Sequence, residues 1–187
     1  MSGTTTATGS TFKYQLDPQH SAAHFKVRHL MISNVKGEFT RVSGNVTFDP
    51  NDLASSNVDV TIEAASISTR EAQRDEHLKS ADFLDVANYP TITFRSTAIV
   101  AAGGDSYEVV GDLTIRGVTR PVALNVESVT AEVKDPWGFV RRGATARTKI
   151  ERKDFGLIWN AALETGGVLV GDDVEITIDA ELTRKAE

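Results

Sequence analysis

Apolar and polar residues alternate along most of this chain, and this alternation restricts the possible folds more than any other feature of the sequence. Between positions 58 and 63, Val58, Val60 and Ile62 alternate with Asp, Thr and Glu. Successive side chains of a β-strand point to opposite faces, so a period of two places the apolar residues on one face. A half-buried antiparallel strand has this pattern. The same alternation is found in the segments 12–16, 25–29, 42–48, 92–94, 107–115, 122–126 and 174–182.

Residues that favour tight turns separate these segments. Gly, Pro, Asp and Asn are concentrated in the stretches 49–52, 103–105, 135–138 and 171–173. Short strands joined by such turns indicate a sandwich or a barrel, and not a sheet with intervening helices. A sheet of roughly eight to ten strands can close into a barrel, which removes its exposed edges. We therefore expect an all-β fold with no internal repeat.

One segment departs from the strand pattern and favours a short helix. Ser68 and Glu71 have the spacing of a capping box, with Ser68 at the N-cap and Glu71 at the third helical position. The residues up to Lys79 are mostly good helix formers. A second helical turn over 81–88 would end before Pro90. This segment would cover one end of a barrel with three apolar side chains, Leu78, Phe83 and Leu84.

Charge and composition exclude several classes of partner. The chain carries a formal net charge of −6, and its Lys and Arg residues are scattered along the sequence. Nucleic-acid binders need a positive footprint that neutralises phosphates, so nucleic acid is not expected as a partner. No apolar run approaches the roughly 20 residues of a transmembrane helix. The absence of cysteine excludes disulfides and cysteine-based metal sites.

The first residues differ in character from the rest of the chain. Residues 1–11 are mostly Thr, Ser, Gly and Ala, without the positive charge and apolar stretch of a secretory signal. We expect residues 1–11 to be a disordered lead-in and residues 12–187 to form a single domain. Because no signal peptide is found in this sequence, the predicted location is the cytoplasm.

The predicted inward faces of the strands are almost entirely hydrocarbon. Barrels of about eight strands are either filled by their own side chains or hold one small ligand. A hydrocarbon-lined cavity favours an apolar chain by about 0.8 kcal/mol for each buried CH₂ group. The alternative is that the same residues pack against each other and leave no cavity.

Several ordered motifs resemble the YceI-like family. The resemblance covers about residues 12 to 183 and implies an extended, antiparallel, lipocalin-like barrel. It also implies polyisoprenoids or other long-chain lipids as the ligand class. Many members of the family look exported, and this chain differs from them at its N-terminus. The motifs are LDPQHS at 16–21, FKVRHL at 25–30, GEF at 37–39, SGNV at 43–46, RDEHLKS at 74–80, DFL at 82–84, YPTITF at 89–94, GDLTIRGVT at 111–119 and DFG at 154–156.

Aromatic and aliphatic residues on the predicted inward faces are the candidate ligand-binding residues, because concave pockets are usually lined by such side chains. For each of them the alternative is an ordinary place in the core. For His29 the alternative is a core histidine bonded to a backbone carbonyl. The candidates are Phe25, Val27, His29, Phe39, Phe48, Ile62, Phe83, Phe94, Leu113, Ile115, Trp137, Phe155, Trp159 and Ile176.

Basic residues near the predicted helix are candidates for holding a lipid head group. A guanidinium can pair bidentately with a phosphate. The alternative for each is a solvated surface charge or, for His77, local packing within the helix. The candidates are Arg28, Arg70, Arg74, His77 and Arg116.

The histidines and serines do not form a recognisable catalytic or metal site. His24 and His29 are five residues apart, so in a regular strand they point to opposite faces. No Gly-x-Ser-x-Gly motif surrounds a serine, which argues against a hydrolase of that type. We therefore expect no metal, no cofactor and no enzymatic activity.

Three hypotheses remain open. The first is a barrel that binds a long apolar lipid. The second is a filled barrel whose outer surface binds another protein. The third is an enzyme that uses the cavity with His29 or His77 as acid and base. A homodimer formed through an exposed strand is compatible with each.

Overall fold

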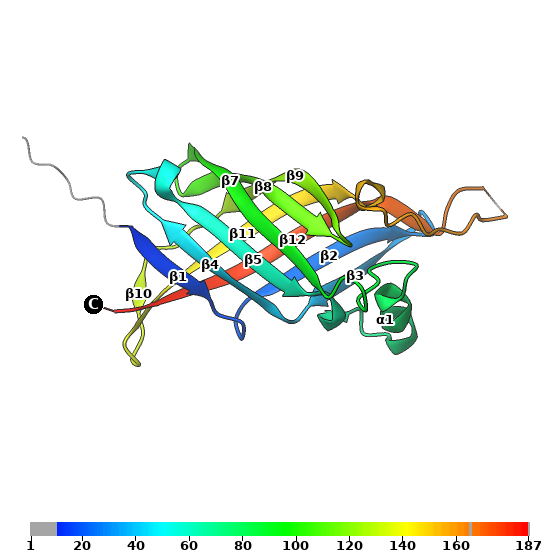
Figure 1. Cartoon of the computed structure of the whole chain (residues 1–187), viewed down its shortest axis with the longest axis horizontal. Coiled ribbons are helices and arrows are strands. Elements are labelled where there is room, and N and C mark those ends of the chain that lie inside the picture. The colour runs from blue at the N-terminus through cyan, green and yellow to red at the C-terminus, as the bar shows by residue number, and fades with distance from the viewer. Residues whose placement is uncertain (1–10, 165, 187) are drawn as a thin grey trace, which may run out of the picture.

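The computed structural model describes residues 11–164 and 166–186, which form an antiparallel sheet of twelve strands (Figure 1). The expected lead-in, residues 1–11, lies outside the described residues except for Thr11. The strands are β1 (Phe12–Leu16), β2 (Ala22–His29), β3 (Ser33–Phe39), β4 (Val42–Phe48), β5 (Asn57–Glu63), β6 (Ile67–Ser68), β7 (Thr91–Gly103), β8 (Ser106–Ile115), β9 (Val118–Glu127), β10 (Val133–Lys134), β11 (Phe139–Glu151) and β12 (Val170–Lys185).

Eight of these strands close into a barrel. The order around the barrel is β11-β9-β8-β7-β5-β4-β1-β12, and the pairing of β12 with β11 completes the circle. That pairing is continuous from Phe139 opposite Lys185 to Glu151 opposite Asp173. The predicted extended antiparallel barrel of about eight strands is therefore confirmed.

Strand β12 is long enough to pair with two different strands along its other edge. Its first half pairs with β2, where Val174 lies opposite Val27, and its last residues pair with β1, where Leu182 lies opposite Leu16. Because β2 continues to β3 and β6, the sheet extends beyond the closed barrel on one side. Figure 1 shows this extension beside helix α1 (Ala72–Lys79).

The two ends of the barrel are therefore different. We call the first the α1 end: it holds α1, the β2–β3 turn and the β11–β12 connection, which begins with the short helix η3 (Arg152–Phe155). We call the second the terminal end, because β1 begins there and β12 ends there. The turns after β4 and β7 also lie at the terminal end, the first with η1 (Leu53–Ser55). A third short helix, η2 (Ala64–Ser66), joins β5 to β6.

Helix α1 begins later than the capping box predicts, so that expectation is wrong. The N-cap is Glu71, whose carboxylate accepts from the backbone N–H of Gln73 (3.2 Å) and of Arg74 (2.6 Å). Ser68 is the last residue of β6, where it pairs with Glu38. Strand pairing holds Ser68 in an extended conformation, and the chain turns only at Arg70, which has φ of 63°.

The predicted second helical turn over 81–88 consists of hydrogen-bonded turns. The backbone N–H groups of Asp85 and Val86 reach back to the carbonyls of Ser80 (2.9 Å) and Lys79 (3.1 Å). Asp85 has φ of 49°, in the left-handed region, which interrupts a regular helix. None of the helices in the described part of the chain is long and apolar enough to cross a bilayer.

Candidate ligand-binding cavity

A cavity of about 290 Å³ lies inside the barrel. Side chains from all eight barrel strands line it, together with Leu78, Phe83 and Leu84 from α1 and the segment that follows. The accessible wall is almost wholly apolar. The volume is close to the lower end of the range of about 300 to 1,000 Å³ for ligand pockets.

Most of the candidate ligand-binding residues lie in the wall of this cavity. The alternation of the strands fixes which side chains face inward, and the barrel encloses that face. That these residues contact a ligand stays a prediction. Ten of the fourteen line the cavity: Phe25, Val27, Phe39, Phe48, Ile62, Phe83, Phe94, Leu113, Ile115 and Ile176.

The other four candidates lie outside the cavity lining. His29 ends β2 beside the β2–β3 turn, and Phe155 is buried within η3. Trp137 is 78% exposed at the tip of the β10–β11 turn, where the Asp135 carboxylate accepts from its backbone N–H. Trp159 lies in the β11–β12 connection. Three of the four lie in turns or connections, where alternation gives no information about the direction of a side chain.

The candidate head-group residues also lie outside the cavity lining, and most make local contacts. Arg28 donates to the Met31 carbonyl (3.2 Å). Arg74 donates to Thr69, both to its hydroxyl (2.7 Å) and to its carbonyl (3.1 Å). Arg70 is exposed at the turn before α1.

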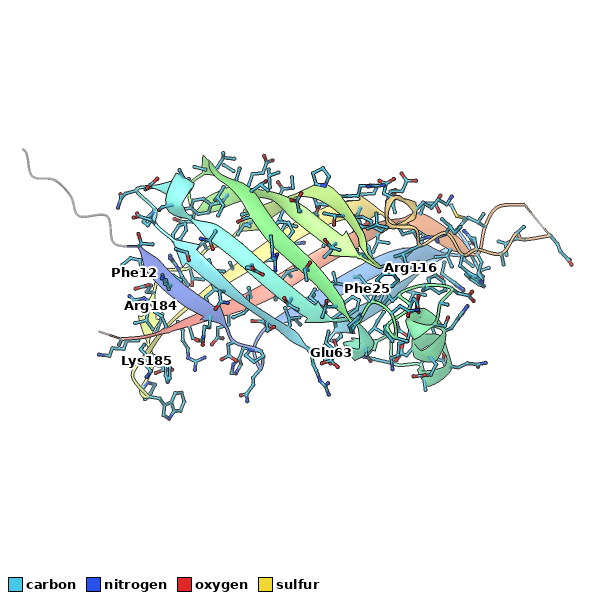
Figure 2. The ribbon with its side chains drawn as sticks, in the orientation of Figure 1. Phe12, Phe25, Glu63, Arg116, Arg184 and Lys185 are labelled. Atoms are coloured by element: carbon cyan, nitrogen blue, oxygen red, sulfur yellow. The ribbon has the colours of Figure 1, made fainter. Side chains whose placement is uncertain are left out.

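Arg116 and His77 hold segments of the α1 end together. Arg116 donates to the carbonyls of Ala81 (2.7 Å) and Gly156 (3.4 Å), which joins the segment after α1 to η3. Figure 2 shows Arg116 at this end of the barrel. His77 packs edge-on against Phe83, with ring centroids 5.1 Å apart, and against Trp159, at 4.8 Å. These contacts pack α1 and the β11–β12 connection together beside the cavity, since Phe83 is part of its wall.

A buried arginine organises the β11–β12 connection at the same end. Arg152 is 3% exposed, and its guanidinium donates to the carbonyls of Leu157, Trp159 (2.9 Å) and Gly171 (2.8 Å). It also reaches the Asp172 carboxylate at 3.3 Å. Burial lowers the pKa of Arg152. Arg152 is among the residues that line the cavity, but its guanidinium donates to backbone carbonyls of the connection and of β12, so we assign it a structural role.

A second polar group lies at the terminal end. The Tyr14 hydroxyl donates to the Glu132 carboxylate, which also accepts from Arg184 at 3.0 and 3.2 Å. Burial raises the pKa of Tyr14, and the hydrogen bond from Arg184 lowers the pKa of Glu132. Figure 2 shows Arg184 beside Phe12 at this end, with the guanidinium carbon 4.6 Å from the ring centroid.

Arg142 lines the cavity near this terminal group, and no candidate from the sequence included it. Its position has the same parity as Ala144 and Ala146, which also line the cavity. This shared parity was the sequence feature that could have predicted an inward-facing Arg142. A charged residue in an otherwise apolar face was not expected to point inward.

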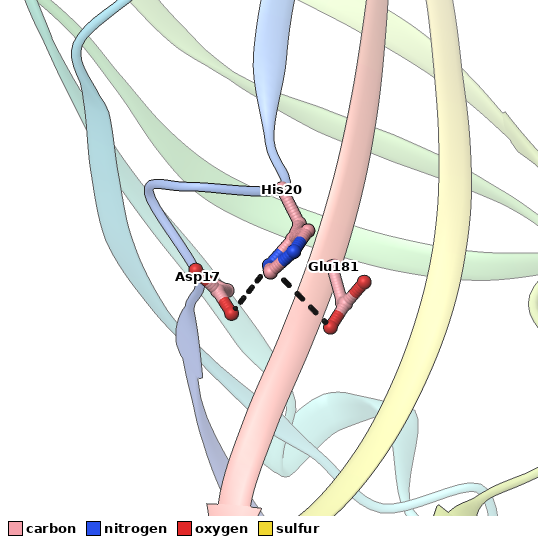
Figure 3. Close-up of side chains that lie close together, drawn as sticks. All are labelled: Asp17, His20 and Glu181. Atoms are coloured by element: carbon pink, nitrogen blue, oxygen red, sulfur yellow. Dashed lines mark hydrogen bonds and ion pairs between the residues drawn. The ribbon is translucent and has the colours of Figure 1, made fainter.

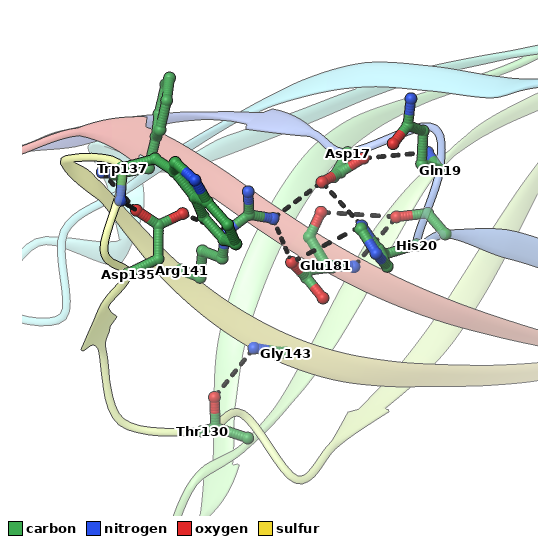
Figure 4. A network of polar contacts seen from close by, with 11 residues as sticks. Asp17, Gln19, His20, Thr130, Asp135, Trp137, Arg141, Gly143 and Glu181 are labelled. Atoms are coloured by element: carbon green, nitrogen blue, oxygen red, sulfur yellow. Dashed lines mark hydrogen bonds and ion pairs between the residues drawn. The ribbon is translucent and has the colours of Figure 1, made fainter.

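An ion-pair network lies outside the cavity near the terminal end. His20 Nδ1 is 2.9 Å from the Asp17 carboxylate and 4.0 Å from that of Glu181 (Figure 3). Arg141 donates to both carboxylates, at 2.8 and 2.5 Å, and to Asp135 at 2.7 Å (Figure 4). The hydrogen bond from His20, with that from Arg141, lowers the pKa of Asp17 to about 2. Because Arg141 occupies the carboxylates, the cluster fits an ion-pair network that ties the β1–β2 turn to β11 and β12.

Comparison with known proteins gives consistent matches over most of the chain. A family model described as the YceI-like domain matches residues 14–182. A UPF0312 protein of Vibrio cholerae is 43% identical over 138 residues, which are 74% of this chain and 72% of the relative. Protein YceI of Escherichia coli is 42% identical over 151 residues, which are 81% of this chain and 78% of the relative.

Solved structures show the same barrel. Burkholderia cenocepacia BcnA has a TM-score of 0.77 at 26% identity, over 89% of this chain and 98% of that one. The YceI protein of Campylobacter jejuni has a TM-score of 0.70 at 33% identity, over 84% and 90%. A polyisoprenoid-binding domain from Saccharophagus degradans shares the fold, with a TM-score of 0.65 at 16% identity over 93% and 98%. Together, the family model and these relatives show that the chain belongs to the YceI-like family.

Proposed function

We propose that this protein binds a long-chain apolar lipid of the polyisoprenoid type inside the barrel, for transport, storage or sequestration. The observation that carries the proposal is the cavity inside the barrel, whose accessible wall is almost wholly apolar. Such a wall favours a hydrocarbon chain over water through the hydrophobic effect. The polyisoprenoid-binding domain with the same fold supports this ligand class.

A filled barrel and an enzyme are the two alternatives. The cavity argues against a filled barrel. For an enzyme, His29 and His77 would have to reach a substrate in the cavity, but neither lines it. His24 does lie at the wall, and its imidazole is held between Glu38 (3.6 Å) and Asp179 (3.7 Å). Binding without chemistry is therefore the function that the geometry favours.

A substitution that fills the cavity tests the proposal. Ala146 lines the cavity on β11, so A146W places an indole in the space that a lipid would occupy. Ala98 on β7 is exposed, and A98W is the matched control. Each protein is purified without detergent, analysed by native mass spectrometry, and extracted with organic solvent to identify any lipid.

We expect a stoichiometric long-chain lipid with the wild type and with A98W, and a loss of that lipid with A146W. If the wild type carries no lipid and takes up no added polyprenyl lipid, the proposal is wrong. Equal lipid content in a folded A146W variant would also contradict it, since the cavity could not then be the binding site.

A further inference from the structure

Two arginines are among the residues that line the cavity, and Arg142 is the one near the terminal end, since Arg152 organises the α1 end. Arg142 lies on the inward face of β11, opposite Leu182 of β12, and both line the cavity. The register from Phe139 to Glu151 places Arg142 near the terminal end of the barrel. A charge facing apolar surroundings is costly unless a partner compensates it. The nearby groups therefore decide what this guanidinium can bind.

The contacts of Arg142 leave part of its guanidinium without an acceptor. Nε and Nη2 donate to the Thr130 carbonyl at 3.2 and 3.0 Å. Within residues 11–164 and 166–186, no hydrogen-bond acceptor is in reach of Nη1. The guanidinium carbon lies 5.4 Å from the ring centroid of Phe48 and 5.9 Å from that of Tyr14. These two rings flank the half-buried guanidinium.

The charge of Arg142 is not balanced locally. Among the described residues, no carboxylate oxygen lies within 4.0 Å of its guanidinium nitrogens. Glu132 is the neighbouring acid, and its carboxylate is bonded to Arg184 and Tyr14. Arg142, Arg184 and Glu132 together carry one net positive charge, and the carboxylates of Asp17, Asp135 and Glu181 lie outside the cavity on Arg141. In a wall of low polarity, such a charge attracts an anion more strongly than it would in water.

We propose that Arg142 binds an anionic oxygen head group, a carboxylate or a phosphate, carried by the lipid in the cavity. This inference rests on the proposed lipid-binding function and adds the chemistry of the head group. The chain of the lipid extends from Arg142 along the cavity towards Leu78, Phe83 and Leu84 at the α1 end. A charge-assisted hydrogen bond from a guanidinium to such an anion is stronger than a neutral one.

Two probes that differ only in their head group test this inference. Hexadecanoate and hexadecanol have the same chain, and their affinities are measured by displacement of a fluorescent lipid at a pH at which the acid is ionised. Acetate and inorganic phosphate are tested as competitors, which separates a lipid head group from a free anion. We expect the wild type to bind hexadecanoate about tenfold more tightly than hexadecanol. Neither small anion should displace the probe at comparable concentrations.

Substitutions then test whether Arg142 causes the preference for the acid over the alcohol. R142Q keeps a polar side chain and removes the charge, and it should bind the acid and the alcohol equally. R142K retains the charge and should keep part of the preference. R147Q is the control, because Arg147 is exposed on the same strand and pairs with Glu127. It should retain the full preference.

Equal affinities of the wild type for acid and alcohol would overturn the inference while leaving the proposed function intact. Displacement of the probe by acetate or phosphate alone would also overturn it, since the chain would not be needed. A folded R142Q variant that keeps the preference would show that Arg142 does not bind the head group. If the wild type binds neither of these probes and no added polyprenyl lipid, the proposed function itself fails.

Discussion

The two ends of the barrel are closed in different ways. At the α1 end, connecting segments hold each other through His77, Phe83 and Trp159, and through the bonds of Arg116 to backbone carbonyls. At the terminal end, closure involves Tyr14 on β1 and Arg184 on β12, both bonded to Glu132. Two connecting segments can separate without disturbing the sheet, whereas Glu132, in the connection between β9 and β10, is bonded to two residues on paired strands. We therefore expect the α1 end to open for the ligand.

The largest expected effect concerns the buried arginine of the α1 end. R152M removes the donors to the carbonyls of Leu157, Trp159 and Gly171 and leaves these part-buried groups without that partner. The free energy of unfolding should fall by about 3–5 kcal/mol, measured by urea denaturation. The neighbouring K153M removes only an exposed ion pair with Asp172, and it should cost at most about 1 kcal/mol.

If R152M is no less stable than K153M, the β11–β12 connection does not depend on Arg152. The aromatic contacts alone would then stabilise the conformation of the α1 end.

A smaller and pH-dependent effect is expected near the terminal end. Hydrogen bonds from His20 and Arg141 lower the pKa of Asp17 from 3.8 to about 2. The folded state therefore favours the ionised carboxylate, and this stabilisation is present above the ordinary pKa and is lost as the pH falls towards 2. D17N should reduce the free energy of unfolding at pH 7 by roughly 1–2 kcal/mol, allowing for solvent screening.

The difference between D17N and the wild type should disappear as the pH falls from about 4 to about 2. D179N is the control, since Asp179 is exposed and 3.7 Å from His24. It should change stability little at any pH. A constant difference between D17N and the wild type down to pH 2 would contradict the role of the Asp17 charge.

The smallest expected effect tests which end opens. R116Q removes the bonds to Ala81 and Gly156, so it should raise the rates of lipid uptake and release severalfold, equivalent to about 1 kcal/mol. The affinity should change little, because Arg116 does not line the cavity. Stopped-flow fluorescence with a lipid probe measures both rates.

R184Q makes the matching change at the terminal end, by removing the bond to Glu132. It should leave the rates close to those of the wild type. If R184Q speeds lipid uptake and release and R116Q does not, the entrance lies at the terminal end and not at the α1 end.

On most regular strands the parity of a residue predicted whether it faces the cavity, although on β2 His29 does not line the cavity and His24 does. Phe25 and Val27 on β2, and Leu113 and Ile115 on β8, line the cavity as the alternation of their segments indicates. Trp137 was predicted from its residue type alone. It lies in a turn that directs it outward, where it is 78% exposed.

At the start of α1, a long-range strand pairing prevents the conformation that the local sequence motif predicts. Ser68 and Glu71 have the spacing of a capping box, but Ser68 is paired with Glu38 at the end of β6. The hydrogen bonds of that pairing keep Ser68 extended, so Glu71 caps the helix instead. Glu38 lies thirty residues before Ser68 in the sequence, so a local motif cannot reveal this pairing.

A period of two and a series of ordered motifs are local properties of the chain, so they predicted the family and eight of the twelve strands. The alternation did not reveal β3, β6, β10 or β11. Long-range pairing sets how β12 divides its edge between β1 and β2, and how its pairing with β11 closes the barrel. That closure encloses the cavity and brings Arg142 beside Tyr14 and Phe48. The balance of charge inside the barrel depends on these long-range contacts, because strand pairing and not sequence distance sets which groups meet.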